Sequence, residues 1–198
     1  MVRDDVLGAG PGPSDSFSAQ ARLAHPAVPV SPSSFVQIAD LPPAERERAV
    51  PIIKDSFVGI YRWHAKRTLR EASLVRGAFV DGQLVGVSML EQLRPEVGYA
   101  YYLAIASARR RQGIGARMLD DALAHFDRAG TEVVFAAAEE ENAASIALLK
   151  SRGFREVERR EKSYLEGGLG AWGLRTRMRL VHGEVLLGLR LRPGTPRS

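Results

Sequence analysis

The apolar residues in the middle of the chain follow two periods, one typical of strands and one typical of helices. Two apolar runs, 77–80 and 84–90, flank Asp81-Gly82, and an Asp-Gly pair between such runs is a strong indication of a β-hairpin. The run 97–106 is long and almost uncharged, as expected of a strand that is covered on both faces. We therefore predict a hairpin followed by a central strand.

The pattern changes to a helical period directly after this strand. Over 113–129 apolar residues recur every three or four positions opposite charged residues, and Gly130 follows as a stop signal. This pattern predicts an amphipathic helix. Upstream of the hairpin, the sequence predicts a helix over 43–57, with a break at Pro51, and a second helix over 60–72.

Short strands and one short helix are expected in the remaining parts of the domain. Asn142 can cap a helix that ends at Gly153. Apolar runs predict strands over 35–39, 133–138, 154–164 and 172–180.

Strands and helices alternate in the middle of the chain, and hairpin-like segments lie at both ends, which indicates an α/β (α+β) domain. The segment 8–34 is crowded with Gly, Pro, Ala and Ser and has no apolar period, so it cannot bury enough surface to offset its ordering entropy. We therefore divide the chain into a disordered leader at 1–34, a folded domain at 35–182 and a C-terminal tail at 183–198.

Composition narrows the class of protein. The 198 residues include no cysteine, which excludes thiolate nucleophiles, and their four histidines lack ligand spacing, so we expect no metal site. No stretch approaches the ~20 apolar residues of a membrane helix, and the first residues carry acids where a signal peptide has bases. A cytoplasmic protein without a membrane partner is expected. The net charge of +5 comes mostly from arginine and favours a partner with phosphates. Proteins that bind single-stranded nucleic acids combine basic with aromatic residues. Because aromatic residues rarely alternate with the arginines here, we expect a nucleotide cofactor and no nucleic acid.

The junction between the central strand and the amphipathic helix carries the clearest chemical signal. A strand that ends near Ala106 passes through a basic loop into a helix that starts near Gly113. The first turn of a helix offers unpaired N–H groups, and glycine lets a phosphate approach the backbone. A dinucleotide fingerprint would need glycine in place of Met118, and a P-loop would need Gly-Lys-Ser or Gly-Lys-Thr where Gly115-Ala116 stands. The loop is therefore a pyrophosphate site of another kind.

Two segments resemble motifs of the GCN5-related N-acetyltransferase (GNAT) family. The run RRQGIG at 110–115 resembles motif A of that family, which reads basic or Gln, any, any, Gly, any, Gly or Ala. The run NAASIALLKSRGF at 142–154 is similar to the second segment of the family, an Asn, a short helix and a Gly-Phe pair that opens a strand. The two runs lie at the separation typical of the family, and the resemblance covers about 35–180.

This resemblance implies a mixed, mostly antiparallel central sheet that is flanked by helices and splayed between its fourth and fifth strands. It implies that acetyl-CoA, the acyl donor, lies in that gap, with the pantetheine against the central strand and the pyrophosphate at the helix turn. Arg110 and Arg111 are expected to add mobile positive charge there. The residues expected to bind acetyl-CoA are Leu103, Ala104, Ile105, Arg110, Arg111, Gln112, Gly113, Ile114, Gly115, Ala116 and Asn142.

The resemblance also implies direct attack of a deprotonated primary amine on the thioester, with a carboxylate as the base. Glu96 and Glu91 flank the turn before the central strand and are the candidates that we favour, Glu96 first; the acids at 139–141 are the other candidates. Tyr61 and His64 fall in the helical segment that forms the acceptor wall in this family. We therefore expect both side chains to contact the acceptor.

One position departs from the pattern of the family. Leu149 stands where many members have a tyrosine that protonates the leaving thiolate. A CoA thiol is a good leaving group with a pKa of ~8.5, so its release does not require an acid. The sequence thus predicts an N-acyltransferase that acetylates a small-molecule or peptide amine, with a catalytically weak acetyl-CoA-binding regulatory module as the alternative. It does not choose among polyamines, aminoglycosides, amino acids and protein N-termini as acceptors, and it leaves a homodimer open.

Overall fold

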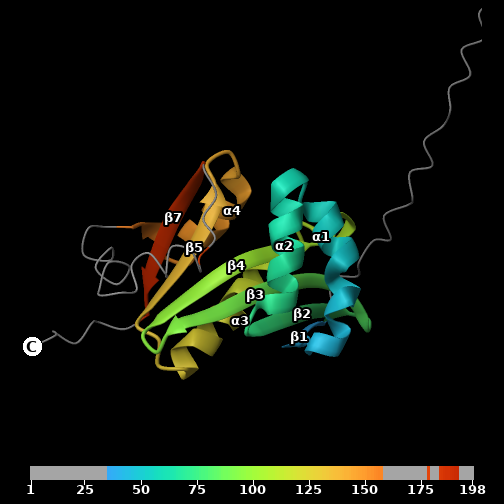
Figure 1. The fold of residues 1–198 in the computed structure, drawn as a ribbon, viewed down its shortest axis with the longest axis horizontal. Coiled ribbons are helices and arrows are strands. Elements are labelled where there is room, and N and C mark those ends of the chain that lie inside the picture. Colours follow the sequence, from blue (N-terminus) through green and yellow to red (C-terminus); the bar gives the residue numbers. More distant parts are fainter. Residues whose placement is uncertain (1–34, 158–177, 179–182, 192–198) are drawn as a thin grey trace, which may run out of the picture.

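The computed structural model describes residues 35–157, 178 and 183–191 of the chain, and within them a seven-stranded sheet has helices on both faces (Figure 1). The strands are β1 Val36–Asp40, β2 Leu74–Val80, β3 Gln83–Arg94, β4 Val97–Ile105, β5 Val133–Glu139, β6 Arg155–Glu156 and β7 Glu184–Arg190. The α-helices are α1 Val50–Ser56, α2 Gly59–Glu71, α3 Ile114–Arg128 and α4 Ala143–Lys150, and the 3-10 helices are η1 Pro43–Ala49 and η2 Ser107–Arg109.

The strands follow the order β1-β2-β3-β4-β5-β7-β6. Every neighbouring pair is antiparallel except β4 and β5, which are parallel and are connected through α3. The apolar side chains of α1 and α2 pack on one face of β2, β3 and β4, whereas α3 and α4 pack on the other face. The sheet is therefore mixed and mostly antiparallel, as the resemblance implied, with β4 at its centre.

The parallel pair β4–β5 is much shorter than either of its strands. Register partners run only from Val97 opposite Val133 to Ala100 opposite Ala136. Beyond that point β4 stays paired with β3 as far as Ile105, and β5 stays paired with β7 to its end. A β-bulge places Tyr101 as an extra residue in β4 at the point where the two strands part. The sheet thus opens into a V between its fourth and fifth strands, as expected.

The local predictions for the first two thirds of the domain are confirmed within a few residues. Asp81 and Gly82 both have positive φ, 50° and 74°, and form the two-residue turn of the β2–β3 hairpin. Pro51 lies in the first turn of α1, where its missing N–H group costs no hydrogen bond. The expected break near Pro51 is the change from the 3-10 helix η1 to α1.

The predicted boundary between the folded domain and a C-terminal tail is wrong. Residues 184–190, assigned to a tail, form β7, which pairs with β5 along its whole length and inserts between β5 and β6. In the strand predicted over 154–164, Arg155–Glu156 form β6, and residues 158–164 lie outside the described residues. The strand predicted over 172–180 and the leader at 1–34 lie outside the described residues, apart from Met178, which is helical and buried.

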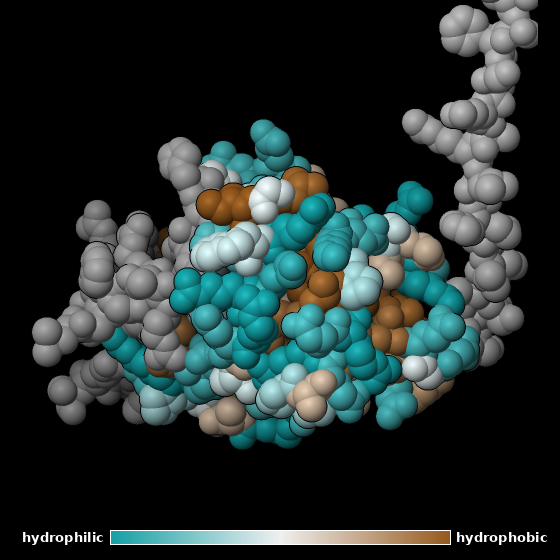
Figure 2. Space-filling model, turned by 45° about the vertical axis from the view of Figure 1, so that its right-hand side comes forward, coloured by the Kyte–Doolittle hydropathy of each residue, from teal (hydrophilic) through white to brown (hydrophobic). Residues whose placement is uncertain are grey.

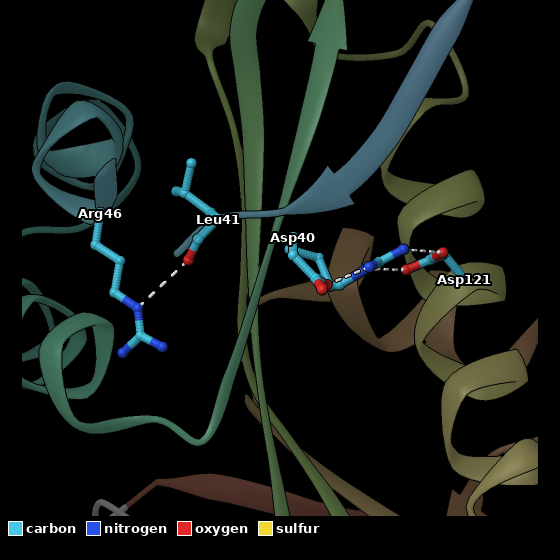
Figure 3. Close-up of polar contacts among 5 residues, drawn as sticks. Asp40, Leu41, Arg46 and Asp121 are labelled. Atoms are coloured by element: carbon cyan, nitrogen blue, oxygen red, sulfur yellow. Dashed lines mark hydrogen bonds and ion pairs between the residues drawn. The ribbon is translucent and has the colours of Figure 1, made fainter. Parts of the chain in front are cut away.

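A buried arginine joins η1 to the end of α2. Arg46 is 7% exposed, and its guanidinium donates to the carbonyl oxygens of Leu69 (3.1 Å) and Arg70 (3.0 Å). It also donates to the carbonyl oxygen of Leu41 at 3.5 Å, the contact drawn in Figure 3. The first two carbonyls belong to the last turn of α2, which carries the negative end of the helix dipole. The cation therefore caps α2 and fixes it against the segment that follows β1.

A second arginine fixes α3 to the outer strands. The Arg76 guanidinium, on β2, donates two hydrogen bonds of 2.8 Å to the Asp121 carboxylate on α3 and a further one to Asp40 on β1. Both carboxylates are drawn in Figure 3. Because a two-point contact of this kind fixes orientation as well as distance, it holds α3 in place beneath the sheet.

We predict that Arg46→Met lowers the free energy of unfolding by roughly 2–4 kcal/mol, because the variant keeps the apolar stem and leaves three carbonyl groups without their donor. Arg48→Met is the matched control: Arg48 pairs with Glu45 at the surface, so its loss should cost at most about 0.5 kcal/mol. Urea denaturation of both variants measures the difference. Equal losses would show that Arg46 does not support α2.

Candidate functional site

The turn between β4 and α3 leaves a helix N-terminus without a side-chain cap. Gly113 occupies the N-cap position with φ of 77°, and no side chain accepts from the first amides of α3. A side chain at Gly113 would extend into open space, so the glycine is needed for its left-handed backbone conformation. The uncapped N–H groups and the helix dipole together form a site for an anion.

Arg110 has a different role from the one expected. Its guanidinium donates to the carbonyl oxygen of Ile105 (3.0 Å) and to the hydroxyl of Ser56 (3.2 Å), and lies 3.8 Å from the Asp55 carboxylate. The prediction of mobile charge at Arg110 is therefore wrong, because these contacts fix the side chain between β4 and the end of α1. Arg111 is exposed, with φ of 59°.

A cavity of ≈ 370 Å³ lies at this turn and continues along the end of β4. Residues from α1, β4, the basic loop, α3 and α4 line it: Ser56, Phe57, Leu103, Ala104, Ile105, Arg109, Arg110, Arg111, Ile114, Gly115, Asn142, Ala144, Ser145 and Leu148. Most of the residues expected to bind acetyl-CoA are thus brought together. Gln112, Gly113 and Ala116 are not among the lining residues, although Gly113 sets the conformation of the turn.

A second cavity, of ≈ 110 Å³, lies in the opening between β4 and β5. Its lining comes from α1, α2, β3, β4, α3, β5, α4 and β7 and consists of Phe57, Tyr61, Ser88, Leu90, Ala100, Tyr101, Tyr102, Leu103, Leu119, Ala122, Ala137, Ala138, Glu139, Asn142, Ser145, Leu148, Leu149 and Glu184. The two cavities share Phe57, Leu103, Asn142, Ser145 and Leu148. They therefore form one groove from the helix turn to the middle of the sheet. On the face of the molecule drawn in Figure 2, apolar side chains lie in patches between hydrophilic ones.

Three polar side chains converge in the second cavity. Tyr61 of α2 and Glu139 at the end of β5 line this cavity together, and Glu139 has Glu184 of β7 as its register partner. Burial first, and then the charges of Glu184 and Glu139, raise the pKa of Tyr61 to about 12. Burial, and next the charge of Glu184, also raise the pKa of Tyr99 on β4. The charge of Glu184 therefore affects tyrosines of both α2 and β4.

The two carboxylates that we favoured as the base lie away from this cavity. Glu96 precedes β4 and therefore lies at its paired end, roughly 20 Å along the strand from Leu103 at ~3.3 Å per residue. Glu91 pairs with Tyr99 in the closed half of the sheet, and its carboxylate accepts from the backbone N–H of Ser73 at 3.0 Å. Neither can reach a thioester near Leu103, so both assignments are corrected. Glu139, from the other candidate run, does line the cavity.

Of the two aromatic residues expected at the acceptor wall, only Tyr61 lines either cavity described above. The His64 ring lies edge-on to the ring of Trp63, with centroids 4.8 Å apart, and its Nδ1 is buried without a hydrogen-bond partner. Trp63 is 57% exposed. Tyr61 and His64 are three positions apart on α2, only about 60° around the helix axis at 100° per residue, so the helical period does not distinguish them.

Several lining residues were not predicted from the sequence. Ser145 and Leu148 follow Asn142 at intervals of three residues in the same short helix, so the helical period would have placed them on its face. Ser88 and Glu184 had no comparable signal. Ser88 lies in an ordinary strand, and Glu184 belongs to β7, which was assigned to a tail.

The described residues include no group of three or more side chains placed to hold a metal ion. Among the helices of the same residues, none is long and apolar enough to cross a membrane.

Comparisons with known proteins agree with this architecture. The model of the acetyltransferase (GNAT) family matches residues 38–154. The N-alpha-acetyltransferase RimI of Mycobacterium tuberculosis is 30% identical over 147 residues, which are 71% of this chain and 91% of that protein. The ribosomal-protein-S18-alanine N-acetyltransferase of Escherichia coli has a similar structure, with a TM-score of 0.61 at 17% identity over 83% of this chain and 99% of the other.

The PaiA N-acetyltransferase of Thermoplasma acidophilum, solved in complex with coenzyme A, has a TM-score of 0.59 at 12% identity over 79% of this chain and 99% of the other. At such identities the two structural matches support the fold alone. The family model covers more than half of the sequence, and it includes both the glycine turn and the Asn142 helix. The chain therefore belongs to the acetyltransferase (GNAT) family.

Proposed function

We propose that this protein is an N-acyltransferase that moves an acetyl group from acetyl-CoA to a primary amine. The observation that carries the proposal is the continuous groove, which begins at an uncapped helix N-terminus and ends at a carboxylate beside the opening in the sheet. The first end suits a pyrophosphate and the second an amine. The printed name of the Mycobacterium tuberculosis relative, an N-alpha-acetyltransferase, supports the same class of reaction.

The residues at the turn fit the phosphates of coenzyme A. The amides that follow Gly113 face the cavity without a competing side-chain cap, and Arg109 and Arg111 border it with two cations. A β-carbon at Gly115 would lie 3.5 Å from the Leu103 side chain and 3.6 Å from that of Leu148. The glycine therefore leaves this part of the cavity free of side-chain atoms. Phosphate oxygens can therefore approach the backbone of α3 directly.

The outer edge of β4 fits the pantetheine arm. Past Ala100, β4 has β3 on one side, and on the other side no described strand is in register with it. Backbone groups from Leu103 to Ile105 face the groove on that side and suit the amides of an extended chain. When bound, acetyl-CoA supplies an activated acetyl thioester.

Glu139 is the residue that we assign to the acceptor's proton. An ammonium has no lone pair at neutral pH and must lose a proton before it attacks. Glu139 stands across the opening from β4 and lines the cavity together with Tyr61. It can therefore accept a proton from an amine that enters between β4 and β5.

Leu149 favours the alternative of a module that binds acetyl-CoA with little turnover. The side chain is 8% exposed, packs with α3 and β5 in the core and also lines the cavity. No hydroxyl is thus available at this position to protonate the leaving thiolate. A release assay for free thiol over a panel of primary amines separates the alternatives, because only the enzyme increases the rate on addition of an amine.

We predict that Gly113→Asp raises the Kd for acetyl-CoA at least about 10-fold, because a carboxylate would face the phosphates, and a lost charge-assisted contact is worth about 1.5–3 kcal/mol. Gly113→Asn is the matched control: Asn tolerates the same left-handed conformation and adds no charge, so its Kd should stay within about 3-fold of wild type. Calorimetry measures all three proteins. An unchanged Kd for the Asp variant would show that the phosphates do not bind at this turn.

We predict that Glu139→Gln lowers kcat/KM at neutral pH by roughly 100-fold, the usual contribution of a general base, while the Kd for acetyl-CoA stays unchanged. Glu140→Gln is the control, because it makes the same charge change at the residue that follows Glu139, and Glu140 is exposed and does not line the cavity. Steady-state rates with a good amine from the panel provide the measurement. If both variants are as fast as wild type, deprotonation takes place in water and not on the protein.

The raised pKa of Tyr61 predicts the pH dependence of the reaction. We expect kcat/KM to rise with pH as the amine loses its proton, with no falling limb near pH ~10, where an ordinary tyrosine ionises. Burial and the charges of Glu184 and Glu139 raise the pKa of Tyr61 to about 12, so its neutral form persists beyond that point. A pH profile of wild type and Tyr61→Phe tests this, and a limb near ~10 that the Phe variant abolishes would contradict it.

A further inference from the structure

The cavity between β4 and β5 extends to both faces of the sheet. Side chains alternate between the faces along a strand, so Ala138 of β5 lies on the face opposite to that of its neighbours Ala137 and Glu139. Ala138 belongs to the same buried cluster as the apolar side chains of α3, whereas Tyr61 borders the cavity from α2, on the other face. The part on the α3 face, which we call the α3-side chamber, has apolar walls from that cluster: Leu90, Ala100, Leu119, Ala122, Ala138 and Leu149.

The α3-side chamber offers more room than an acetyl group fills. Small side chains line it from three elements, with Ala100 on β4, Ala122 on α3 and Ala138 on β5. An apolar cavity of about 150 Å³ holds benzene, so a cavity of ≈ 110 Å³ has room for a chain of about four heavy atoms. Acetyl adds a single methyl group beyond its carbonyl. The chamber therefore suits a longer acyl chain.

Ser88 places a hydroxyl in this chamber. It lies on β3 opposite Leu103 of β4, and residues directly opposite in an antiparallel pair share a face. Leu103 packs against clusters that include α3, so Ser88 also points to the α3 face. Its side chain is 2% exposed, and its hydroxyl has no hydrogen-bond partner among the described residues. Because a buried hydroxyl without a partner is unfavourable, the chamber favours a ligand that brings a hydrogen-bonding group.

The charges of the lining residues decide which kind of group fits. Glu139 and Glu184 line the cavity, and none of its described lining residues is Lys, Arg or His. A malonyl or succinyl chain would bury its terminal carboxylate without a basic partner, which is very unfavourable. A neutral hydroxyl can pair with Ser88 while the methylene groups of the chain contact leucine and alanine. Because Ser88 lies one strand further from the opening than β4, that hydroxyl belongs beyond the second carbon.

We propose that the α3-side chamber binds the chain of a short 3-hydroxyacyl group carried by coenzyme A, which the protein accepts in addition to acetyl-CoA, and that Ser88 hydrogen-bonds the chain hydroxyl. This inference rests on the proposed acyl transfer and makes Ser88 a specificity-determining residue. In the transfer the amine nitrogen bonds to the thioester carbon, the C–S bond breaks, and a proton from the amine reaches the leaving sulfur through Glu139 and solvent. The products are an amide and free coenzyme A, and the chain hydroxyl takes no part.

The test compares butyryl-CoA with the two enantiomers of 3-hydroxybutyryl-CoA, which have the same chain and differ in the hydroxyl. One enantiomer should bind wild type at least about 5-fold more tightly than butyryl-CoA, because it satisfies a buried hydroxyl that the plain chain leaves without a partner. Ser88→Ala should bring the two Kd values within about 2-fold of each other. Calorimetry measures the Kd values, and kcat/KM with a good amine from the panel should show the same ratios.

Ser73→Ala is the matched control. It makes the same change at an exposed serine, whose hydroxyl donates to the carbonyl oxygen of Leu90 at 3.2 Å and which lines neither cavity. This variant should keep the wild-type preference for the hydroxylated chain. Melting temperatures of both variants show whether loss of fold contributes.

The possible failures can be distinguished. Equal Kd values for the hydroxylated and plain chains in wild type would overturn the inference, and so would a preference that survives Ser88→Ala. Either result leaves acetyl transfer intact. If no amine is acylated from any donor, the proposed enzyme fails, and the Kd values still test the hydroxyacyl site: a preference that Ser88→Ala abolishes supports it, and equal binding overturns it.

Discussion

The early end of the β4–β5 pairing is the constraint on which the rest of this structure depends. Four residues of each strand are in register, from Val97 to Ala100 and from Val133 to Ala136, and the strands then separate inside the sheet. Separation exposes backbone N–H and C=O groups that a continuous sheet would satisfy. An extended ligand that enters the gap can form hydrogen bonds with these groups instead. The separation of the strands therefore weakens the sheet and at the same time provides an edge of β4 to which a ligand can bind.

Packing of α3 against the sheet stabilises the opening between β4 and β5, beginning where the two strands are still paired. A β-carbon at Gly98 would lie 2.6 Å from the Phe126 ring, so α3 approaches β4 closely where β4 and β5 are paired. Toward the open end, α3 still packs on the inner strands through Ile114 and Met118, both buried, and the Arg76–Asp121 contact fixes it to β2. Because α3 cannot shift easily, its uncapped N-terminus stays at the mouth of the groove.

The sequence predicted the features that local chemistry determines and missed those that depend on distant pairing. Gly113 and the Asp81-Gly82 turn need a positive φ, and such positions can be recognised from a few neighbouring residues. Glu96 was assigned wrongly because a residue that precedes a strand lies at the end opposite to the one that opens. Glu184 was missed because β7 pairs with β5, whose sequence lies far from it, and no local pattern indicates that neighbour.

The two ends of the groove differ in charge, and this difference matches the two substrates of an acetyl transfer. Arginines and an uncapped helix N-terminus surround the turn, whereas two glutamates and no described basic residue line the opening. A polyanionic donor is attracted to the first end and a cationic acceptor to the second, and each is repelled by the other end. These charges support the proposed arrangement, in which the phosphates of the donor lie at the turn and the amine of the acceptor lies beside Glu139.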